Sequence, residues 1–241
     1  AVRRWGRARG PLRRPEDCDG DGFAWELGPE EQAAPSAPEE ASASGTLARR
    51  SQHLRYLLVL DLEGKDEIIE FPVIALDTWE LREVGRFQRF VRPQPLFDGC
   101  AQTPDSPAIL FPAVLEEFGQ WLCQTVGHGL KGVGGAHATT AFLTCGDWDC
   151  KHVHAQCRIC SIPVPPAFRQ WVNIKRSYSE AYGGDFRGMK SMLSRLKLLD
   201  RDGNVLHGFH HLGMHDVENI SRCALHLLKD DGELRLNGGM R

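Results

Sequence analysis

The chain has 241 residues, of which 41% are hydrophobic and 25% are charged, and its formal net charge is -3. This length can bury one sizeable core and leave a shorter segment outside it. The sequence contains no apolar run of the roughly 18 residues that a membrane helix needs, so we expect no membrane partner. A net charge so close to zero supplies no overall field for a polyanion, and nucleic-acid binding would therefore depend on local basic patches or metal ions.

The cysteines exclude a disulfide-stabilised scaffold. Eight cysteines are too few for such a scaffold in a chain of 241 residues. They favour free thiols in a reducing compartment.

Residues 1–54 are predicted to form a disordered or targeting segment. Six arginines and no acidic residue occur in residues 1–14, and the stretch that follows is rich in Pro, Ala, Ser and Glu. Such a composition cannot bury a core. An Arg-rich, acid-poor start is typical of an organellar transit peptide, which would direct the protein to the chloroplast or another organelle. The alternative is a plain disordered tail on a protein of the cytoplasm or nucleus.

From Arg55 onward the pattern becomes periodic and predicts one domain over residues 55–236, followed by a tail at 237–241. Three segments predict the strands of a meander: Tyr56–Glu63, Glu67–Asp77 and Gly85–Val91. A helix is predicted at Phe111–Val126, a strand at Ala141–Cys145 and a helix at Trp148–Cys157. Further helices are predicted at Ser177–Tyr182, Met189–Leu198 and Asp216–Leu228. Hairpin strands followed by alternating helices and strands indicate an α/β fold with a mixed sheet.

Asp61 and Glu63 lie two residues apart at the end of the apolar run Leu57–Leu60. Residues two apart in a strand point to the same side of the sheet, so both carboxylates can share a cation. A pair of solvated edge charges is the alternative, but a run that is apolar throughout predicts a strand buried on both faces. Carboxylates that emerge from such a strand would be costly without a partner.

Two more carboxylate positions occur where core elements meet. Asp149 lies where a predicted strand gives way to a helix, and Asp216 opens the last helix after a loop that contains four histidines. Separated carboxylates at the ends of core elements suit two hard cations about 4 Å apart, and an imidazole nearby can deprotonate water. Each aspartate alone has a second explanation, because Asp147 and Asp216 both stand where an N-cap is expected.

Several further motifs are specific in combination. They are Asp61-Leu62-Glu63-Gly64, Glu67-Ile68-Ile69-Glu70-Phe71-Pro72, Thr144-Cys145-Gly146-Asp147-Trp148-Asp149, Gln156-Cys157, Trp171-Val172-Asn173-Ile174 and His210-His211-Leu212-Gly213-Met214-His215-Asp216-Val217-Glu218-Asn219-Ile220. Together they resemble the Eri-like (histone-mRNA 3′-end) exoribonucleases, which are DEDDh 3′→5′ exonucleases, and above all the plant and algal branch. The resemblance extends from about Arg55 to Leu236. It implies a ribonuclease H-like exonuclease fold, in which helices flank a mixed central sheet.

The resemblance also implies an activity, a cofactor and a set of site residues. The activity would be hydrolysis of RNA from its 3′ end, releasing nucleoside monophosphates, in RNA processing or maturation such as rRNA maturation. Two Mg²⁺ ions, with Mn²⁺ as a substitute, would be held by four carboxylates: Asp61, Glu63, Asp149 and Asp216. His211 would act as the general base. The partner would be single-stranded RNA or an RNA 3′ end.

Three residues take substrate roles from the same resemblance. Trp148 would stack on the terminal base, and the backbone of Leu62 and Gly64 would line the pocket for the 3′ nucleotide. The family carries an acidic residue just before its last ligand, where this chain has His215. We expect His210 and His215 to be surface residues of the loop, and the sequence does not specify an oligomeric state.

Basic and aromatic residues are interleaved between Phe168 and Arg201. Basic residues can follow an RNA backbone, and aromatic residues can stack on bases. The alternative is a set of amphipathic helices whose aromatic residues belong to the core and whose basic residues are solvated.

A non-catalytic single-stranded nucleic-acid-binding module or a zinc-binding module is the rival function. The zinc alternative is based on six soft ligands: Cys145, Cys150, His152, His154, Cys157 and Cys160. Their spacing lacks a second Cys-x-x-Cys pair. Gly127, Gly129 and Gly132 match G-x-G-x-x-G but follow a predicted helix instead of a strand, so they do not predict dinucleotide binding.

Overall fold

The computed structural model describes residues 52–94, 106–135, 137–205 and 212–240. All of these residues lie within one compact unit, Ala41–Arg241. Most of the predicted N-terminal segment, and His210 and His211, lie outside the described residues. The targeting segment and the position of the general base therefore stay predictions.

The described residues form one mixed sheet with the strand order β4-β3-β2-β1-β5-β6-β7. The strands are β1 (Tyr56–Leu60), β2 (Glu70–Asp77), β3 (Arg82–Arg92), β4 (Ile109–Leu110), β5 (Thr140–Thr144), β6 (Gln170–Asn173) and β7 (Gly238–Gly239). β1, β2 and β3 pair in antiparallel fashion as the predicted meander, whereas β5 is parallel to β1 and β6 is parallel to β5. The predicted mixed α/β fold is confirmed.

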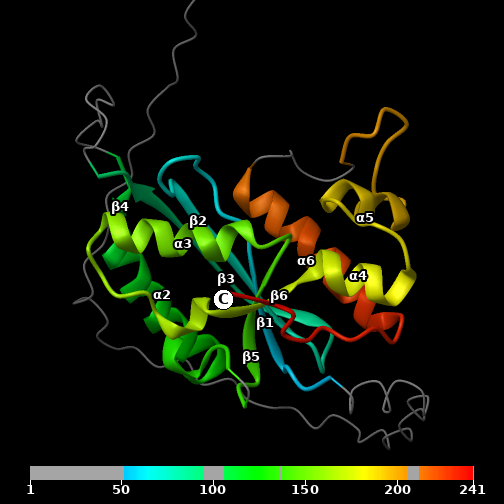
Figure 1. Ribbon diagram of the computed structural model, residues 1–241, viewed down its shortest axis with the longest axis horizontal. Coiled ribbons are helices and arrows are strands. Elements are labelled where there is room, and N and C mark those ends of the chain that lie inside the picture. The colour runs from blue at the N-terminus through cyan, green and yellow to red at the C-terminus, as the bar shows by residue number, and fades with distance from the viewer. Residues whose placement is uncertain (1–51, 95–105, 136, 206–211, 241) are drawn as a thin grey trace, which may run out of the picture. The chain divides into compact units, whose positions relative to one another are not determined.

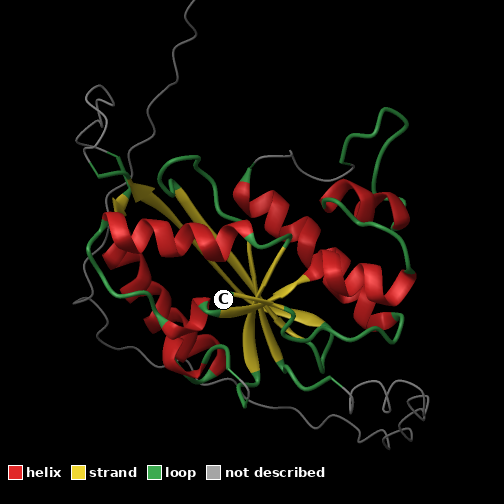
Figure 2. Ribbon diagram, in the orientation of Figure 1, coloured by secondary structure: helices red, strands yellow, loops and turns green. Residues whose placement is uncertain are grey.

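Helices cover both faces of this sheet, as Figures 1 and 2 show. They are α2 (Phe111–Val126), α3 (Trp148–Ile159), α4 (Ile174–Tyr182), α5 (Met189–Arg195) and α6 (Gly213–Lys229), with 3₁₀ helices η1 (Leu130–Gly132) and η2 (Pro166–Phe168). One core joins α2 and α3 to the sheet, and the other joins α4, α5 and α6 to its opposite face. None of the helices among the described residues is long and apolar enough to cross a membrane.

Strand β1 is buried on both faces, as its continuous apolar run predicts. Leu58 and Leu60 belong to the core beneath α2 and α3, and Leu57 and Val59 belong to the core beneath α6. All four side chains are 0% exposed. Because water is excluded on both sides of the strand, a charge close to its end is partly desolvated and is favoured by a compensating protein group or a bound cation.

Element boundaries differ from the predictions where tertiary contacts override local pattern. β2 begins at Glu70 instead of Glu67, and α6 begins at Gly213 instead of Asp216. Strand β6 was not predicted, because its four residues are too short to show a period. Gly238–Gly239, within the predicted C-terminal tail, pairs with β6 as strand β7.

The aromatic residues between Phe168 and Arg201 mostly serve the core. Trp171 and Tyr178 are 0% exposed, and Tyr182 and Phe186 pack against the core cluster beneath α6. This favours the amphipathic explanation for these aromatic side chains. Among the basic residues of the same region, Arg176 and Arg187 are exposed and Lys175 is partly exposed.

Candidate active site

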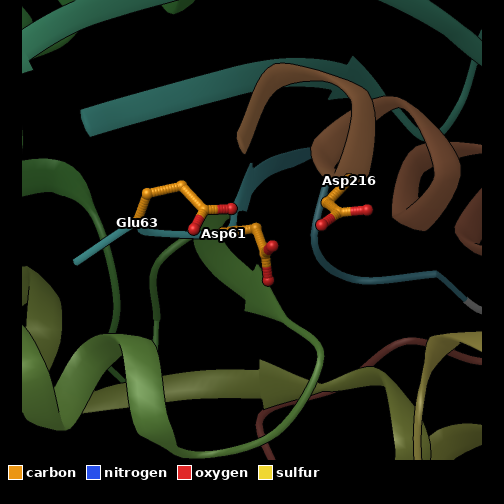
Figure 3. A group of neighbouring side chains, drawn as sticks. All are labelled: Asp61, Glu63 and Asp216. Atoms are coloured by element: carbon orange, nitrogen blue, oxygen red, sulfur yellow. The ribbon is translucent and has the colours of Figure 1, made fainter. Parts of the chain in front are cut away.

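The carboxyl end of β1 carries the first two predicted ligands. Asp61 directly follows the strand, Glu63 lies two residues further, and Asp216 comes from the first turn of α6. One carboxylate oxygen from each residue lies within 4.8 Å of those of the other two (Figure 3). Residues that are 155 positions apart in the chain, from Asp61 to Asp216, therefore form a single acidic cluster.

A tight turn fixes the segment that holds Glu63. Gly64 has φ 113°, and a Cβ atom there would lie 2.0 Å from the carbonyl oxygen of Glu67. Only glycine fits this close approach at a positive φ. The Ile69 amide donates to the Glu63 carbonyl at 2.8 Å and closes the turn. The backbone of Glu63 thereby has one defined position.

Helix α3 holds the same segment through two buried side chains. Asp149 Oδ1 accepts a hydrogen bond from the Leu62 amide at 2.9 Å, and Gln156 Oε1 accepts one from the Ile68 amide at 2.8 Å. Gln156 Nε2 also donates to Glu67 Oε2 at 3.1 Å. The sequence assigned no role to Gln156 beyond its place in a motif. The one signal in the sequence was the place of Gln156 on the apolar face of the predicted helix. A glutamine buried there has to pair with other buried polar groups.

Gly213 allows α6 to approach the cluster. A Cβ atom at Gly213 would lie 2.9 Å from Pro72 Cγ, 3.1 Å from Glu70 Oε2 and 3.2 Å from Glu63 Cγ. Each of these contacts is tighter than van der Waals packing permits without movement. The absence of a side chain at Gly213 therefore allows α6 to lie close to Pro72, Glu70 and Glu63 without displacing them.

The electrostatics of the site reflect burial and the closeness of several carboxylates. Desolvation by burial, followed by the charges of Asp149, Asp216, Glu63 and Glu70, raises the pKa of Asp61 well above its usual value. Desolvation by burial also raises the pKa of Asp149 to about 6, against the hydrogen bond from the Leu62 amide and the charge of Lys175, which lower it. Asp149 thus lies within electrostatic reach of Asp61 and Glu63.

This donor set fits hard divalent cations. All the converging atoms are carboxylate oxygens, the ligands that Mg²⁺ and Ca²⁺ prefer. Two of the carboxylates, Asp149 and Asp216, also lie in the first turns of helices, where the helix dipole favours negative charge. The raised pKa values of Asp61 and Asp149 reflect a desolvation cost on their charged forms. Bound cations would offset it.

Asp147 differs from its neighbours although it stands at the N-cap position of α3. Its side chain makes no capping hydrogen bond, so the alternative explanation of Asp147 as a helix cap does not hold. Asp147 Oδ1 instead accepts from Trp171 Nε1 and Asn173 Nδ2, each at 2.9 Å, and Oδ2 accepts from Arg176 Nη2 at 2.6 Å. Asp216 also does not cap its helix, because the N-cap residue of α6 is Leu212.

Comparison with known proteins identifies the family. No family model matches the chain. An exonuclease domain-containing protein of Arabidopsis thaliana is 36% identical over 205 residues, which cover 78% of this chain and 58% of the relative. Human 3′-5′ exoribonuclease 1 is 32% identical over 205 residues, covering 77% of this chain and 56% of the relative.

Solved structures agree with these relatives. The nuclease domain of 3′hExo, a DEDDh family member bound to rAMP, superposes with a TM-score of 0.64 at 29% identity and covers 78% of this chain and 98% of that domain. A 3′-exonuclease that recognises the 3′ end of the histone mRNA stem-loop superposes with a TM-score of 0.65 at 30% identity, covering 79% and 88%. The chain belongs to the Eri-like DEDDh 3′→5′ exonucleases. It spans less than two thirds of the curated relatives, 58% and 56% of their lengths.

Membership of the DEDDh family confirms the ribonuclease H-like exonuclease fold that the motifs implied. It also gives context to Trp148, Leu62 and Gly64. The Trp148 side chain is 48% exposed at the start of α3, and its ring lies edge to face with His152 at a centroid distance of 4.3 Å. Leu62 is buried and its amide is occupied by Asp149. The substrate roles of these three residues stay predictions.

The soft ligands of the DEDDh domain do not form a zinc site. All six candidates are described, and none belongs to a group of three or more converging ligand atoms within the described part of the chain. His154 Nε2 instead pairs with the Phe168 carbonyl at 3.0 Å, and Gln156 Nε2 donates to Cys160 Sγ at 3.6 Å. Burial raises the pKa of the Cys157 thiol to about 11. The prediction of free thiols agrees with the described cysteines, which form no disulfide.

Proposed function

We propose that this domain is a Mg²⁺-dependent 3′→5′ exoribonuclease. The observation that carries the proposal is the convergence of carboxylate oxygens from Asp61, Glu63 and Asp216 within 4.8 Å. Asp149 is buried beside them and bonded to the segment between Asp61 and Glu63. Family membership supports hydrolysis of phosphodiester bonds as the chemistry of this site.

Four carboxylates would hold the cations: Asp61, Glu63, Asp149 and Asp216. Bound Mg²⁺ would supply charge stabilisation at the phosphoryl group and lower the pKa of the attacking water, and Mn²⁺ would serve in its place. The contacts from α3 and the close approach of α6 at Gly213 would hold these carboxylates near one another before any cation binds. Such preorganisation removes the cost of gathering the ligands during the reaction.

His211 would accept the proton of the attacking water. The assignment rests on its spacing of five residues before Asp216 in the family motif. A neutral imidazole is suited to this step near pH 7, because its pKa lies close to the working pH. Trp148 would stack on the terminal base and so orient the last phosphodiester bond.

The substrate that we propose is an RNA 3′ end that carries a free hydroxyl. One solved relative recognises the 3′ end of the histone mRNA stem-loop, and another was crystallised with rAMP, which has the form of a mononucleotide product. The chain would then trim single-stranded RNA 3′ ends, stepwise, during RNA processing or maturation. Blocked 3′ ends should resist.

A nuclease assay tests this function directly. RNA labelled at its 5′ end should shorten in single-nucleotide steps in Mg²⁺, and RNA labelled at its 3′ end should release a labelled mononucleotide at once. EDTA should stop both reactions. Internal cleavage of a circular RNA, or full activity in EDTA, would contradict the proposal. The variant Asp61→Asn provides the control for a contaminating nuclease.

A further inference from the structure

A cleft lies beside α4, next to the carboxylate site. Its volume is about 580 Å³. It is lined by Asn173, Lys175, Arg176, Ser179, Glu180, Asp185, Phe186 and Arg187. Three of these eight side chains are cationic, and Phe186 supplies an aromatic ring.

The sheet topology places this cleft next to the carboxylates. β5 and β6 are parallel neighbours, so α3 and α4 both start at the same edge of the sheet. Asp149 lies in the first turn of α3, and Lys175 lies in the first turn of α4. A Cβ atom at Gly146, which precedes α3, would lie 3.2 Å from Lys175 Nζ. The charge of Lys175 also acts to lower the pKa of Asp149, although desolvation by burial dominates and raises it.

Lys175 differs from the other cations of the cleft in its partners. Arg176 pairs with Asp147 at 2.6 Å, and Arg187 pairs with Asp185 at 2.7 Å. Lys175 Nζ donates to the Arg187 carbonyl oxygen at 3.3 Å, and within the described residues it forms no ion pair. Its ammonium group is therefore in ion-pair contact with none of the described carboxylates, although its charge acts on Asp149 from beyond ion-pair distance.

The first turn of α4 is held firmly against α3. Asn173 Oδ1 accepts from the Lys175 amide at 3.2 Å and caps the helix. The same residue donates through Nδ2 to Asp147 Oδ1 at 2.9 Å. Because Asp147 stands just before Trp148 and Asp149, these bonds fix the position of the Lys175 backbone relative to the predicted ligands.

An acidic site needs such a cation to hold a polyanion. The carboxylate cluster repels RNA phosphates until cations bind, and the chain as a whole has a net charge of -3. Lys175 follows the carboxyl end of the neighbouring strand β6, and from there it can hold a phosphate that lies outside the reaction centre.

We propose that the α4 cleft binds the RNA strand on the 5′ side of the scissile bond, with Lys175 contacting a phosphate there. The inference rests on the proposed exonuclease function and adds a subsite to it. Lys175 would position the substrate without taking part in the bond-breaking step. The subsite would serve only substrates that carry a phosphate upstream of the scissile one.

Two substrates separate this role from a role at the carboxylates. A dinucleoside monophosphate contains only the scissile phosphate, whereas a heptanucleotide also contains upstream phosphates. The assays are run at pH 8, which is well above the pKa of Asp149, about 6. The variants are Lys175→Ala, the charge-retaining Lys175→Arg, and the control Lys131→Ala. Lys131 is an exposed lysine in η1, which precedes the amino end of β5 at the other edge of the sheet.

We expect Lys175→Ala to raise KM for the heptanucleotide about tenfold, as for the loss of one charge-assisted phosphate contact, with kcat unchanged. The plot of log KM against log salt should lose about 0.7 of its slope, the contribution of one phosphate contact on a single strand. Turnover of the dinucleoside monophosphate should not change. Lys175→Arg should restore most of the affinity, and Lys131→Ala should behave as the parent.

Other outcomes would overturn the inference. Equal losses on both substrates would show that Lys175 acts on the carboxylate site, and unchanged KM on the heptanucleotide would show that the strand leaves by another path. If the parent chain cleaves neither substrate in Mg²⁺, the proposed function fails and the subsite fails with it. If the parent cleaves both substrates, the proposed function stands and the Lys175 variants test the subsite alone.

Discussion

Asp147 and Asp149 lie two residues apart at the start of α3, yet their surroundings are opposite. Asp149 is 4% exposed and faces other carboxylates, and desolvation raises its pKa to about 6. Asp147 is also partly desolvated, which acts to raise its pKa, but hydrogen bonds from Asn173 and Trp171 and the charge of Arg176 outweigh this and lower it. Three side-chain donors stabilise the charged form of Asp147, whereas the hydrogen bond from the Leu62 amide does not outweigh the desolvation of Asp149.

This difference distinguishes a structural carboxylate from a cation ligand. A charge that the protein itself neutralises contributes to stability, whereas a buried charge that it leaves unneutralised destabilises the cation-free state. Such a cluster persists where bound cations offset the cost. Variants of these carboxylates test whether Asp147 is structural and whether the clustered carboxylates are cation ligands.

The largest effect is expected from Asp61→Asn. Removing one carboxylate from the cluster should lower kcat/KM at least about 10³-fold, or about 4 kcal/mol of transition-state stabilisation. The unfolding midpoint in EDTA should not fall, because a repelled buried charge has been removed. Mg²⁺ should raise the midpoint of the parent and have less effect on the variant, as thermal unfolding would measure.

A variant Asp61→Asn that keeps parental activity would remove Asp61 from the proposed ligand set. A lower midpoint in EDTA would show that Asp61 is structural, like Asp147. Asp147→Asn is the matched control, since we expect it to retain most of the activity.

His211→Ala should lower the single-turnover rate by about 10²–10⁴-fold, the typical contribution of a positioned general base. Binding of Mg²⁺ and RNA should change little. The rate of the parent should fall as pH drops through the titration of the imidazole, since a protonated ring cannot accept a proton. His210→Ala and His215→Ala should be mild. A larger loss of rate in His215→Ala than in His211→Ala would contradict this assignment. So would a rate of His211→Ala that still falls at low pH, because the general base would then be another residue.

Gln156→Leu tests whether α3 must hold the Glu63 segment. The change leaves the buried Ile68 amide without its acceptor and removes a donor to Glu67. Leaving such groups unsatisfied costs about 1–3 kcal/mol in the free energy of unfolding. Chemical denaturation would measure this cost, and KM for Mg²⁺ should rise as the turn loosens. Gln120→Leu on the exposed face of α2 is the control. Equal stability of both variants would contradict the proposed role.

The smallest effect is a difference in pH dependence, measured as the free energy of unfolding in EDTA over a range that extends from below pH 4 up to pH 8. The pKa of Asp149 in the folded state, about 6, lies above its unfolded value of about 3.9, so its protonation stabilises the fold as pH falls from about 6 to about 4. Asp147 has a lowered pKa, so its contribution is present above about pH 4 and is lost below it.

The variants Asp149→Asn and Asp147→Asn separate these two contributions. The stability of the parent relative to Asp149→Asn should increase between pH 7 and pH 5. Relative to Asp147→Asn it should stay constant over that range and decline in more acidic solution. Parallel curves for the two variants would show that the carboxylates share one environment.

Much of this architecture follows from local pattern. The helix Phe111–Val126 was predicted with its observed bounds, and the apolar run Leu57–Leu60 predicted a strand buried on both sides. These features depend on which residues repeat at a helical or strand period, and that information is present in the chain itself. The pattern missed strand β6 and the first turn of α6. Strand β6 has only four residues, too few to show a period, and is stabilised by pairing with β5 and β7.

The sequence by itself determined the core strand, the Asp61 and Glu63 pair at its end, and the motifs that place this chain among the DEDDh exonucleases. Only the tertiary structure decided which carboxylates converge and which are neutralised. Asp147 receives its donors from Trp171, Asn173 and Arg176, which lie 24, 26 and 29 residues away. Charge and burial are properties of the folded neighbourhood, so two aspartates with the same local sequence signal acquire opposite pKa shifts.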